Sequence, residues 1–249
     1  MDFVQSLERG LAVIQTFDAE HPRLTLSEVA ARAGLTRATA RRLLLTLGEL
    51  GYVSAAGRQF SLTPRVLDIG YAYLSSLNVQ QIAQPYLESL SERVHESVSV
   101  TVLDGADVVY VARVPTKRIM TISLGLGSRL PAYCTSMGRV LLAELGPDEL
   151  AAALPASLER HTERTVTTRA ELAVVLKQVR AQGWALLDQE LEMGLRSVAV
   201  PLRDSSERAV AAMNVSTQVA RTPIDQLYER FVPELVTTAG QISEALAKR

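Results

Sequence analysis

Apolar residues in the first third of the chain recur at the three- and four-residue spacing of amphipathic helices. In the segment 6–17 they are Leu7, Leu11, Ile14 and Phe17. A second segment opens at Thr25 and has Glu28 three residues later, which is the capping-box pattern of a helix start. Gly34 suits the position just after a helix end. The pattern therefore predicts helices over 6–17 and 25–33.

The third helical segment has a core face and a polar face. Thr36 is a suitable cap for its start. Its core face has five apolar positions at helical spacing: Ala40, Leu43, Leu44, Leu47 and Leu50. Ala38 and Arg42 point away from that face, and Thr39 and Arg41 lie on its flank. Two helices around a glycine-containing turn form a helix-turn-helix, whose second helix enters the major groove of DNA.

A hairpin and a further helix follow. The segment "YVSAAGRQFSL" at 52–62 predicts two short strands around Ala-Ala-Gly, with Arg58 just past the tip. We interpret this hairpin as a wing that contacts phosphate. Thr63-Pro64 begins a predicted linker helix over 63–77. Its apolar stripe comprises Val66, Leu67, Gly70, Tyr71 and Leu74. This stripe has no obvious partner in a small DNA-binding module, so we expect the helix to pack against another copy of the chain.

Beyond residue 78 the pattern changes to strands. A hairpin over 97–114 turns at Asp104-Gly105. Further strands are expected in 121–134, 183–191, 195–204 and 208–219. Helices are expected over 79–94 with a break at Pro85, over 135–145, across most of 148–182 and over 223–248. Strands outnumber crossover helices, so we predict an α+β fold with a mixed or antiparallel sheet flanked by helices.

The charge distribution marks the N-terminal part of the chain. The chain has 249 residues, which suits two domains, and a net charge of −1. Residues 1–65 hold eight arginines and six acids, a net of +2, so the remainder carries −3. Within 36–62 four arginines face one glutamate. This asymmetry predicts nucleic-acid binding by the first part only. We expect domains over 1–62 and 78–249, joined by the helix at 63–77.

Cysteine usage and the apolar runs indicate the compartment. Cys134 is the only cysteine, which excludes a disulfide within the chain and indicates a reducing cytoplasm. No apolar run approaches the roughly 20 residues of a membrane span, and the N-terminus has charges inside its apolar pattern. We expect neither a signal peptide nor a membrane span.

Two other classes of function are alternatives to DNA binding. One is an enzyme in the sheet domain, fused to a regulatory winged helix. The stretch after Cys134 lacks the first glycine of a nucleophile elbow, and the three histidines have no triad arrangement around them. Metal-ligand spacings are also absent, so no metal or cofactor is expected. The other alternative is a protein-interaction module, but the arginine excess and the small residues Ala38 and Thr39 favour DNA.

The segments "LTLSEVAARAGLTRATARRLLLTLGELGYV", "GSRLPAYCTSMGRVLLA" and "LLDQELEMGLRSVAVPLRD" occur in this order. With them the chain closely resembles the IclR family of bacterial transcription regulators over nearly its whole length. The stretches "LTRATARR", "TPRVLDIGYAYLSSL", "VYVARVPTKRIM" and "DQELEMGLRSVAVP" are typical of the regulators of protocatechuate, 4-hydroxybenzoate and the β-ketoadipate pathway. The resemblance implies a GAF-like effector domain and dimers or tetramers on double-stranded operator DNA. It also implies a switch by a small carboxylate of the aromatic or β-ketoadipate type, with another keto or hydroxy acid as the alternative.

The second helix and the wing supply the expected DNA contacts. Arginine can pair bidentately with guanine or with phosphate, and which arginine does which stays open. The expected contact residues are Thr36, Arg37, Ala38, Thr39, Arg41, Arg42 and Arg58.

The expected effector site centres on the turn "PAYCTSMGR" at 131–139. Thr135 or Ser136 caps the helix that starts there. The amides of Ser136, Met137 and Gly138 then have no partner within the helix, so this terminus suits a carboxylate. We also expect Gly138 to let the ligand sit close. The resemblance places the effector around this same turn.

A neighbouring strand completes the expected pocket. Many family members carry Cys where Ser197 stands and Asp where Leu187 stands, and Ser197 is expected to supply a hydroxyl. Asp188 or Glu190 orients a polar tail of the effector or holds the loop. The expected contacts are Cys134, Thr135, Ser136, Met137, Gly138, Asp188, Glu190 and Ser197. Should the helix terminus not hold the carboxylate, the candidate cations are Arg113, Arg129 and Arg139.

Overall fold

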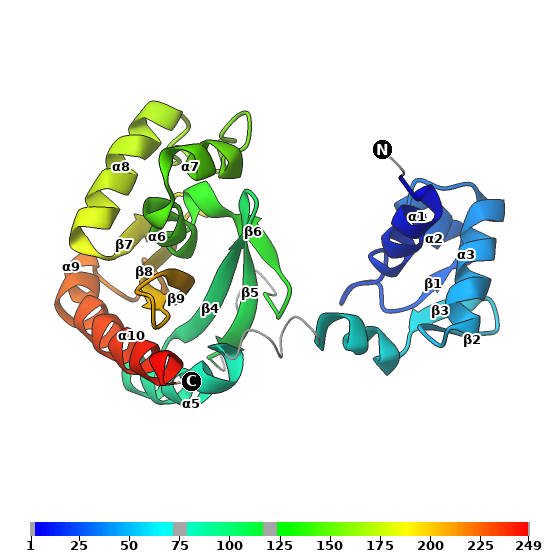
Figure 1. Ribbon diagram of the computed structural model, residues 1–249, viewed down its shortest axis with the longest axis horizontal. Coiled ribbons are helices and arrows are strands. Elements are labelled where there is room, and N and C mark those ends of the chain that lie inside the picture. The colour runs from blue at the N-terminus through cyan, green and yellow to red at the C-terminus, as the bar shows by residue number, and fades with distance from the viewer. Residues whose placement is uncertain (1–2, 72–78, 117–123, 249) are drawn as a thin grey trace. The chain divides into compact units, whose positions relative to one another are not determined.

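The computed structural model describes residues 3–71, 79–116 and 124–248. The chain divides into two compact units, residues 1–76 and 77–249, which are treated separately below (Figure 1). The domain limits at 62 and 77 expected from the sequence stay a prediction, because residues 72–77 of the connecting segment lie outside the described residues.

The N-terminal unit is a winged helix-turn-helix. Its helices are α1 (Gln5–Ile14), α2 (Leu26–Arg32) and α3 (Arg37–Glu49). Its strands are β1 (Leu24–Thr25), β2 (Val53–Ala56) and β3 (Gln59–Leu62). They form an antiparallel sheet in the order β1-β3-β2. The sequence pattern missed β1, which has two residues and therefore shows no alternation of its own.

Local capping explains where these helices begin and end. The Thr25 side chain accepts a hydrogen bond from the Glu28 amide, and the Glu28 carboxylate accepts one from the Thr25 amide at 2.7 Å, which confirms the capping box. Gly34 has a φ of +65°, the left-handed conformation that glycine adopts without strain. Thr36 caps α3 by accepting from the Thr39 amide. The helix-turn-helix is therefore specified mainly by neighbours within four residues.

The ends of the predicted apolar faces differ from expectation. Leu50 is 51% exposed because it lies at the C-cap of α3, beyond the last turn that contacts the core. The first helix ends at Ile14 rather than at 17, and the Thr16 hydroxyl bonds the Val13 carbonyl just after it. In that helix Val13 is buried, whereas Leu7 is 64% exposed.

The expected linker helix is visible only at its start. It begins as a 3-10 turn, η1 (Pro64–Val66), which Thr63 caps by accepting from the Arg65 amide. Residues 67–71 continue as α-helix. The remainder of the predicted helix, including Leu74, lies outside the described residues.

The C-terminal unit is built on one six-stranded sheet in the order β6-β5-β4-β9-β8-β7. The strands are β4 (Ser97–Asp104), β5 (Asp107–Val114), β6 (Arg129–Pro131), β7 (Ala185–Asp188), β8 (Leu195–Arg203) and β9 (Ala209–Gln218). All neighbouring strands are antiparallel, which confirms the expected sheet type. The fold is α+β, as predicted.

Helices pack against both faces of this sheet (Figure 1). One set is η2 (Ala132–Cys134), α6 (Ser136–Glu144), α7 (Pro147–Ala153) and α8 (Arg169–Gln182). The other set is α5 (Val79–Val94), α9 (Ile224–Gln226), the π-helical turn η3 (Leu227–Phe231) and α10 (Val232–Ala247). In β8 the buried Ala199 packs with the α6 cluster, and its neighbours Val198 and Val200 face the other side. The side of the sheet covered by α6 also holds the polar pocket described below.

Two expectations about helices were wrong. The helix α5 runs through Pro85 without interruption. Pro85 has no amide hydrogen to donate to the carbonyl of Gln81, one turn earlier. Both residues lie on the exposed side of α5, so water can donate a hydrogen bond to that carbonyl instead. The segment 148–182 is less helical than expected, because 154–168 between α7 and α8 is irregular. Among the described helices none has the length and apolar character needed to cross a membrane.

Candidate nucleic-acid interface and ligand pocket

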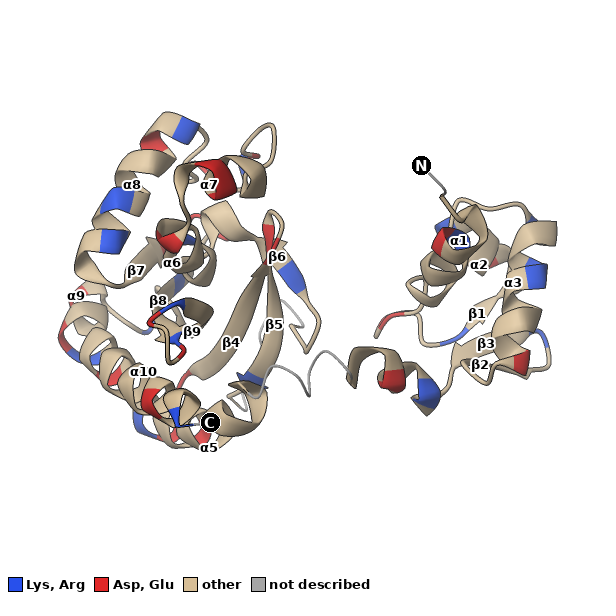
Figure 2. Ribbon diagram, in the orientation of Figure 1, with Lys and Arg blue, Asp and Glu red and all other residues tan. Residues whose placement is uncertain are grey.

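The helix α3 presents an exposed basic face. Arg37, Arg41 and Arg42 are all exposed, as is Ala38, while Thr39 is partly buried. Figure 2 shows the basic positions of α3 along its ribbon. None of these three arginines forms an ion pair within the described residues, so their guanidinium groups are available to an anionic partner. This confirms that the polar face of α3 points to solvent.

The wing adds a fourth exposed arginine. Gly57 and Arg58 form the turn between β2 and β3, and Gly57 has a φ of +63°. Arg58 is exposed and lies in the turn itself rather than just past it. Thr36, at the N-cap of α3, is also exposed. The structure thus places all seven predicted DNA-contact residues on α3, its cap or the wing of one unit.

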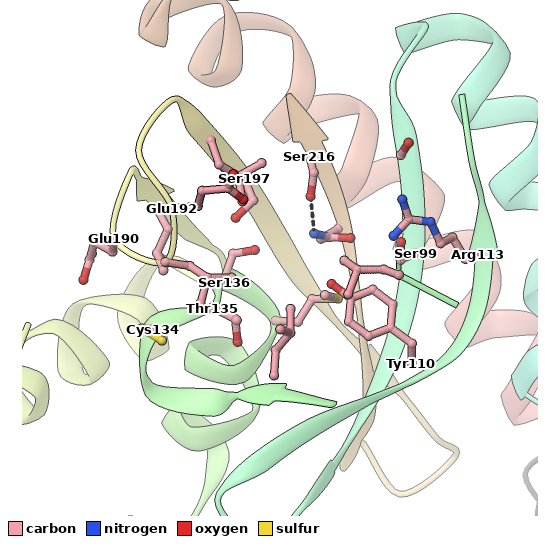
Figure 3. A pocket seen from close by; sticks show the side chains of 18 residues that line it. Ser99, Tyr110, Arg113, Cys134, Thr135, Ser136, Glu190, Glu192, Ser197 and Ser216 are labelled. Carbon is pink, nitrogen blue, oxygen red and sulfur yellow. Dashed lines mark hydrogen bonds between the residues drawn. The ribbon is translucent and has the colours of Figure 1, made fainter. Parts of the chain in front are cut away.

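A cavity of about 40 Å³ lies in the C-terminal unit, between the sheet and the start of α6 (Figure 3). Strand residues from β4, β5, β8 and β9 line one side, and the α6 turn and the loop after β7 line the other. Six of the eight predicted effector contacts line it: Cys134, Thr135, Ser136, Met137, Glu190 and Ser197.

Strand register explains why polar side chains gather here. Ser97 of β4, Ser216 of β9 and Ser197 of β8 are direct cross-strand partners. Two residues further along, Ser99 of β4 pairs with Asn214 of β9, and Arg113 of β5 pairs with Ser99. Residues two apart in a strand face the same side of a sheet, so both rows point into the cavity.

Two buried polar atoms at the cavity have no hydrogen-bond partner. They are Ser136 Oγ and Asn214 Oδ1, in residues that are 1% and 3% exposed. The Asn214 amide nitrogen donates to Ser216 Oγ at 2.9 Å, so the unpaired atom is the acceptor. Buried polar groups are normally hydrogen-bonded. These two atoms therefore mark the cavity as a binding site for a polar molecule.

The N-terminus of α6 differs in detail from the expected cup of three amides. Thr135 is the N-cap, and its hydroxyl accepts from the Gly138 amide at 3.2 Å. That leaves the amides of Ser136 and Met137 without a partner among the described residues. Gly138 does not face the cavity: a Cβ there would lie 2.1 Å from the carbonyl oxygen of Ala132. The expectation that Gly138 admits the ligand was wrong, since this glycine instead permits close packing of α6 on η2.

A buried ion pair joins α6 to the loop that closes the pocket. Arg139, 3% exposed, donates to both carboxylate oxygens of Glu190 at 2.6 and 2.5 Å, and its Nε donates to the Tyr133 carbonyl at 2.9 Å. The hydroxyls of Thr162 and Thr165 donate to the loop backbone at 2.7 and 2.6 Å. Glu190 therefore fixes the loop, and its negative charge is balanced by Arg139.

Asp188 is not a pocket residue. It lies at the end of β7 and accepts hydrogen bonds from Arg196 Nε at 2.6 Å and from Arg164. Burial raises the pKa of Asp188, but the hydrogen bond and charge of Arg196 outweigh it, so the pKa is lowered overall. Of the two expected roles, ligand contact or support of the loop, only the second agrees with this position.

The thiol and the buried phenol in the wall are held neutral. Burial raises the pKa of the Cys134 thiol to about 12, so it is a thiol rather than a reactive thiolate at neutral pH. Burial likewise raises the pKa of Tyr110 to about 12, partly opposed by the charge of Arg113. No group of three potential metal ligands occurs within the described ranges.

Twelve pocket residues were not in the expected contact set, and seven of them are polar: Ser97, Ser99, Tyr110, Arg113, Glu192, Asn214 and Ser216. The sequence identifies Arg113 only as an alternative cation. The signal that identifies the serines and Asn214 is alternation, because "SVSV" at 97–100 and "NVS" at 214–216 place polar residues every second position within apolar strands.

Comparisons with known proteins cover both units. The IclR helix-turn-helix domain matches residues 6–56, and the C-terminal domain of bacterial IclR transcriptional regulators matches residues 71–244. The Pca regulon regulatory protein of Pseudomonas putida is 46% identical over 98% of this chain and 85% of its own. The p-hydroxybenzoate hydroxylase transcriptional activator of Acinetobacter baylyi is 35% identical over 97% of this chain and 91% of its own.

Solved structures of bacterial regulators resemble this chain over nearly its whole length. A protein of Rhodococcus sp. RHA1 described as a transcriptional regulator superposes with a TM-score of 0.87 at 58% identity, covering 99% of both chains. An IclR homolog of Microbacterium hydrocarbonoxydans in complex with 4-hydroxybenzoate has a TM-score of 0.86 at 25% identity, covering 97% of this chain and 98% of its own. With both of its units matched, the chain belongs to the IclR family and is a transcription regulator rather than an enzyme.

Proposed function

We propose that this regulator binds double-stranded operator DNA through α3 and the wing, and that a small organic carboxylate bound in the C-terminal pocket switches it. The genes it controls are those of aromatic-acid catabolism, and it acts in the cytoplasm as a homodimer or a tetramer. The main support for a ligand-operated switch is the pocket, in which two buried polar atoms lack hydrogen-bond partners. A pocket of this kind calls for a ligand that completes its hydrogen bonds.

The relatives support the class of ligand. One is a regulator of the pca regulon, one is a transcriptional activator of p-hydroxybenzoate hydroxylase, and one solved homolog holds 4-hydroxybenzoate. Aromatic acids and the β-ketoadipate type both fit a pocket with polar ends and apolar walls. Another small keto or hydroxy acid is the alternative.

For DNA we propose the contact set on α3, its cap and the wing: Thr36, Arg37, Ala38, Thr39, Arg41, Arg42 and Arg58. The N-terminal half of the second helix of such a motif reads base edges, and a wing arginine contacts phosphate. For the effector we propose the six predicted residues that line the cavity, with Glu190 acting through the loop.

The test of the whole function joins the two units. Thermal unfolding of the full chain is followed with a panel of aromatic acids and pathway intermediates, because a ligand of the native state raises the melting temperature. The stabilising acid is then added to a complex of the chain with DNA from its own promoter region. We expect the acid to change the DNA affinity. An acid that raises the melting temperature but leaves DNA binding unchanged would refute the switch.

A second test concerns the helix terminus. Thr135 has an extended backbone, φ −122° and ψ 146°, which is compatible with a following proline. Ser136→Pro removes one amide and the hydroxyl at the first helical position, where proline is tolerated. Ser136→Ala removes the hydroxyl alone. We expect both variants to fold and to bind the acid more weakly, with the larger loss in Ser136→Pro. Unchanged affinity in both would exclude this terminus from the site.

A further inference from the structure

We propose that the pocket is polarised: Arg113 binds the carboxylate of a hydroxy-substituted aromatic acid, and the Ser136 end binds its hydroxyl. This inference rests on the proposed function, because it concerns the same pocket. It adds which end of the effector lies where, and it selects a hydroxy acid over a dicarboxylate. It also makes Arg113 the residue that determines specificity for an acid.

The charges around the cavity are unequally distributed. Figure 3 shows Arg113 on one side of the cavity, and Glu190 and Glu192 on the other. The charge of Glu190 is balanced by Arg139, but Glu192 forms no ion pair within the described part of the chain. A ligand carboxylate is attracted to the first side and repelled from the second.

The side chains of the other two candidate cations do not line the cavity. Arg129 pairs with Asp104 at 2.7 Å and with Asp107 at 3.1 Å, away from the cavity. Arg139 uses both terminal nitrogens on Glu190. Of the three arginines, Arg113 is the one whose side chain lines the pocket.

The neighbours of Arg113 also suit a carboxylate. Tyr110 precedes it by three positions on β5, and Ser99 is its cross-strand partner on β4. Both line the cavity, and Figure 3 shows them on the Arg113 side. A protonated phenol and a hydroxyl can each donate a hydrogen bond to a carboxylate, and hydrogen bonds to an ionised acceptor are stronger than those between neutral groups.

The remaining polar atoms call for a hydroxyl rather than a second carboxylate. Asn214 Oδ1 is an acceptor without a donor, and a carboxylate has no hydrogen to give it. A ring hydroxyl both donates and accepts. It can therefore satisfy Asn214 Oδ1 or Ser136 Oγ and also receive a bond from the amides of Ser136 and Met137.

The spacing of the strands separates the two ends. Arg113 lies on β5 and Ser197 on β8, three strands apart in the order β5-β4-β9-β8. At about 4.8 Å per spacing, their backbones are about 14 Å apart along the sheet. The Arg113 side chain and one aromatic ring together bridge such a span. Leu130, Met137 and Leu187 also line the cavity and provide apolar contacts for the ring.

The experiment is calorimetric titration of the full chain with four ligands of similar length. They are 4-hydroxybenzoate, benzoate, benzene-1,4-dicarboxylate and 4-hydroxybenzyl alcohol. For the wild-type chain we expect 4-hydroxybenzoate to bind most tightly. Arg113→Gln should weaken its binding about 10-fold to 100-fold, the usual effect of losing a hydrogen bond to a charged group. The alcohol has no carboxylate, so its affinity should not change.

Two further variants control this result. Arg113→Lys keeps the positive charge and should retain part of the affinity lost in Arg113→Gln. Arg129→Gln removes an arginine from the same part of the unit but outside the cavity and should bind as the wild type does. Should Arg113→Gln not fold, the wild-type ligand series and Arg113→Lys still decide the question.

The outcomes separate this inference from the function it rests on. If no acid of the thermal-unfolding panel binds the wild-type chain, the proposed function and the inference fail together. If another acid of that panel binds but 4-hydroxybenzoate does not, the inference alone is wrong. If the acids bind and Arg113→Gln weakens them no more than Arg129→Gln does, the inference alone is wrong. Binding of the dicarboxylate as tightly as 4-hydroxybenzoate, or more tightly, also contradicts the inference. It would mean that the α6 terminus binds a second carboxylate rather than a hydroxyl.

Discussion

Gly138 is the glycine at which an added Cβ would meet the closest neighbours. An added Cβ would lie 2.1 Å from the oxygen, 2.3 Å from the Cα and 2.5 Å from the carbonyl carbon of Ala132. All three are backbone atoms, so no side chain can move aside. Any larger residue must push α6 away from η2, and both elements line the pocket.

We predict that Gly138→Ala lowers the free energy of unfolding by at least about 2 kcal/mol, in the range of overpacked cores. The matched control is Gly240→Ala in α10, where a Cβ meets nothing within 4 Å. That change should leave stability unchanged or raise it by up to about 1 kcal/mol, because alanine favours helix over glycine. Urea unfolding of both variants measures this. Similar effects of the two substitutions would contradict the packing argument.

At the scale of single residues, the sequence predicts the role of a side chain when its hydrogen-bond partner is close in the chain. The caps at Thr25 and Thr36 use amides three positions away, so their types and spacing suffice. Asp188 could not be placed in this way. Its partner Arg164 is 24 positions away, and only the folded loop brings the two together. The roles of charged pocket residues therefore depend on tertiary contacts that periodicity does not contain.

At the scale of elements, we propose that the exposed side chains of α3 decide DNA binding. We predict that Arg41→Ala or Arg42→Ala reduces affinity for the operator by about 1–3 kcal/mol if the arginine contacts a base. A phosphate contact would instead weaken binding to all sequences and reduce the salt dependence. Mobility-shift titrations measure both effects. The control is Arg208→Ala, an exposed arginine of the other unit, and operator affinity unchanged in both α3 variants would exclude the assignment.

The loop after β7 is the element that the Arg139–Glu190 pair holds in place. Glu190→Ala leaves Arg139 buried without its acid, so we expect a loss of about 3–5 kcal/mol in unfolding free energy. Glu192→Ala in the same loop removes an acid with no ion pair in the described residues, and its effect should stay within about 0.5 kcal/mol. Chemical denaturation compares them. Equal stability of the two variants would show that the pair does not anchor the loop.

Element prediction succeeded where periodicity was long and failed where it was short or interrupted. Helices α3 and α6 and the hairpin of β4 and β5 follow the expected ranges closely. The break at Pro85 was wrong because an exposed carbonyl tolerates the missing bond. The irregular stretch 154–168 was missed because its hydrogen bonds are made by side chains such as Thr162 and Thr165 to a distant loop.

For the whole molecule, the apolar surface of the N-terminal unit indicates self-association. Leu7, Leu67 and Tyr71 are 64%, 70% and 67% exposed. We expect the chain to be at least a dimer at micromolar concentration, as measured by sedimentation equilibrium. Leu67→Glu should shift it toward a smaller species, since a charge at an apolar interface is costly. Val174→Glu, at a 71% exposed residue of α8, serves as the control. A wild-type monomer with and without DNA would rule the dimer out.

The cavity has a consequence for how fast the regulator can respond. Its volume of about 40 Å³ is well below the roughly 150 Å³ of a cavity that admits benzene. We expect the loop held by Arg139 and Glu190 to open before an aromatic acid enters. Association rates fall when binding waits for such a rearrangement. In stopped-flow mixing the observed rate should therefore reach a plateau at high acid concentration, and that plateau is the opening rate of the loop. A rate that rises linearly without limit would mean that the acid enters the closed pocket directly.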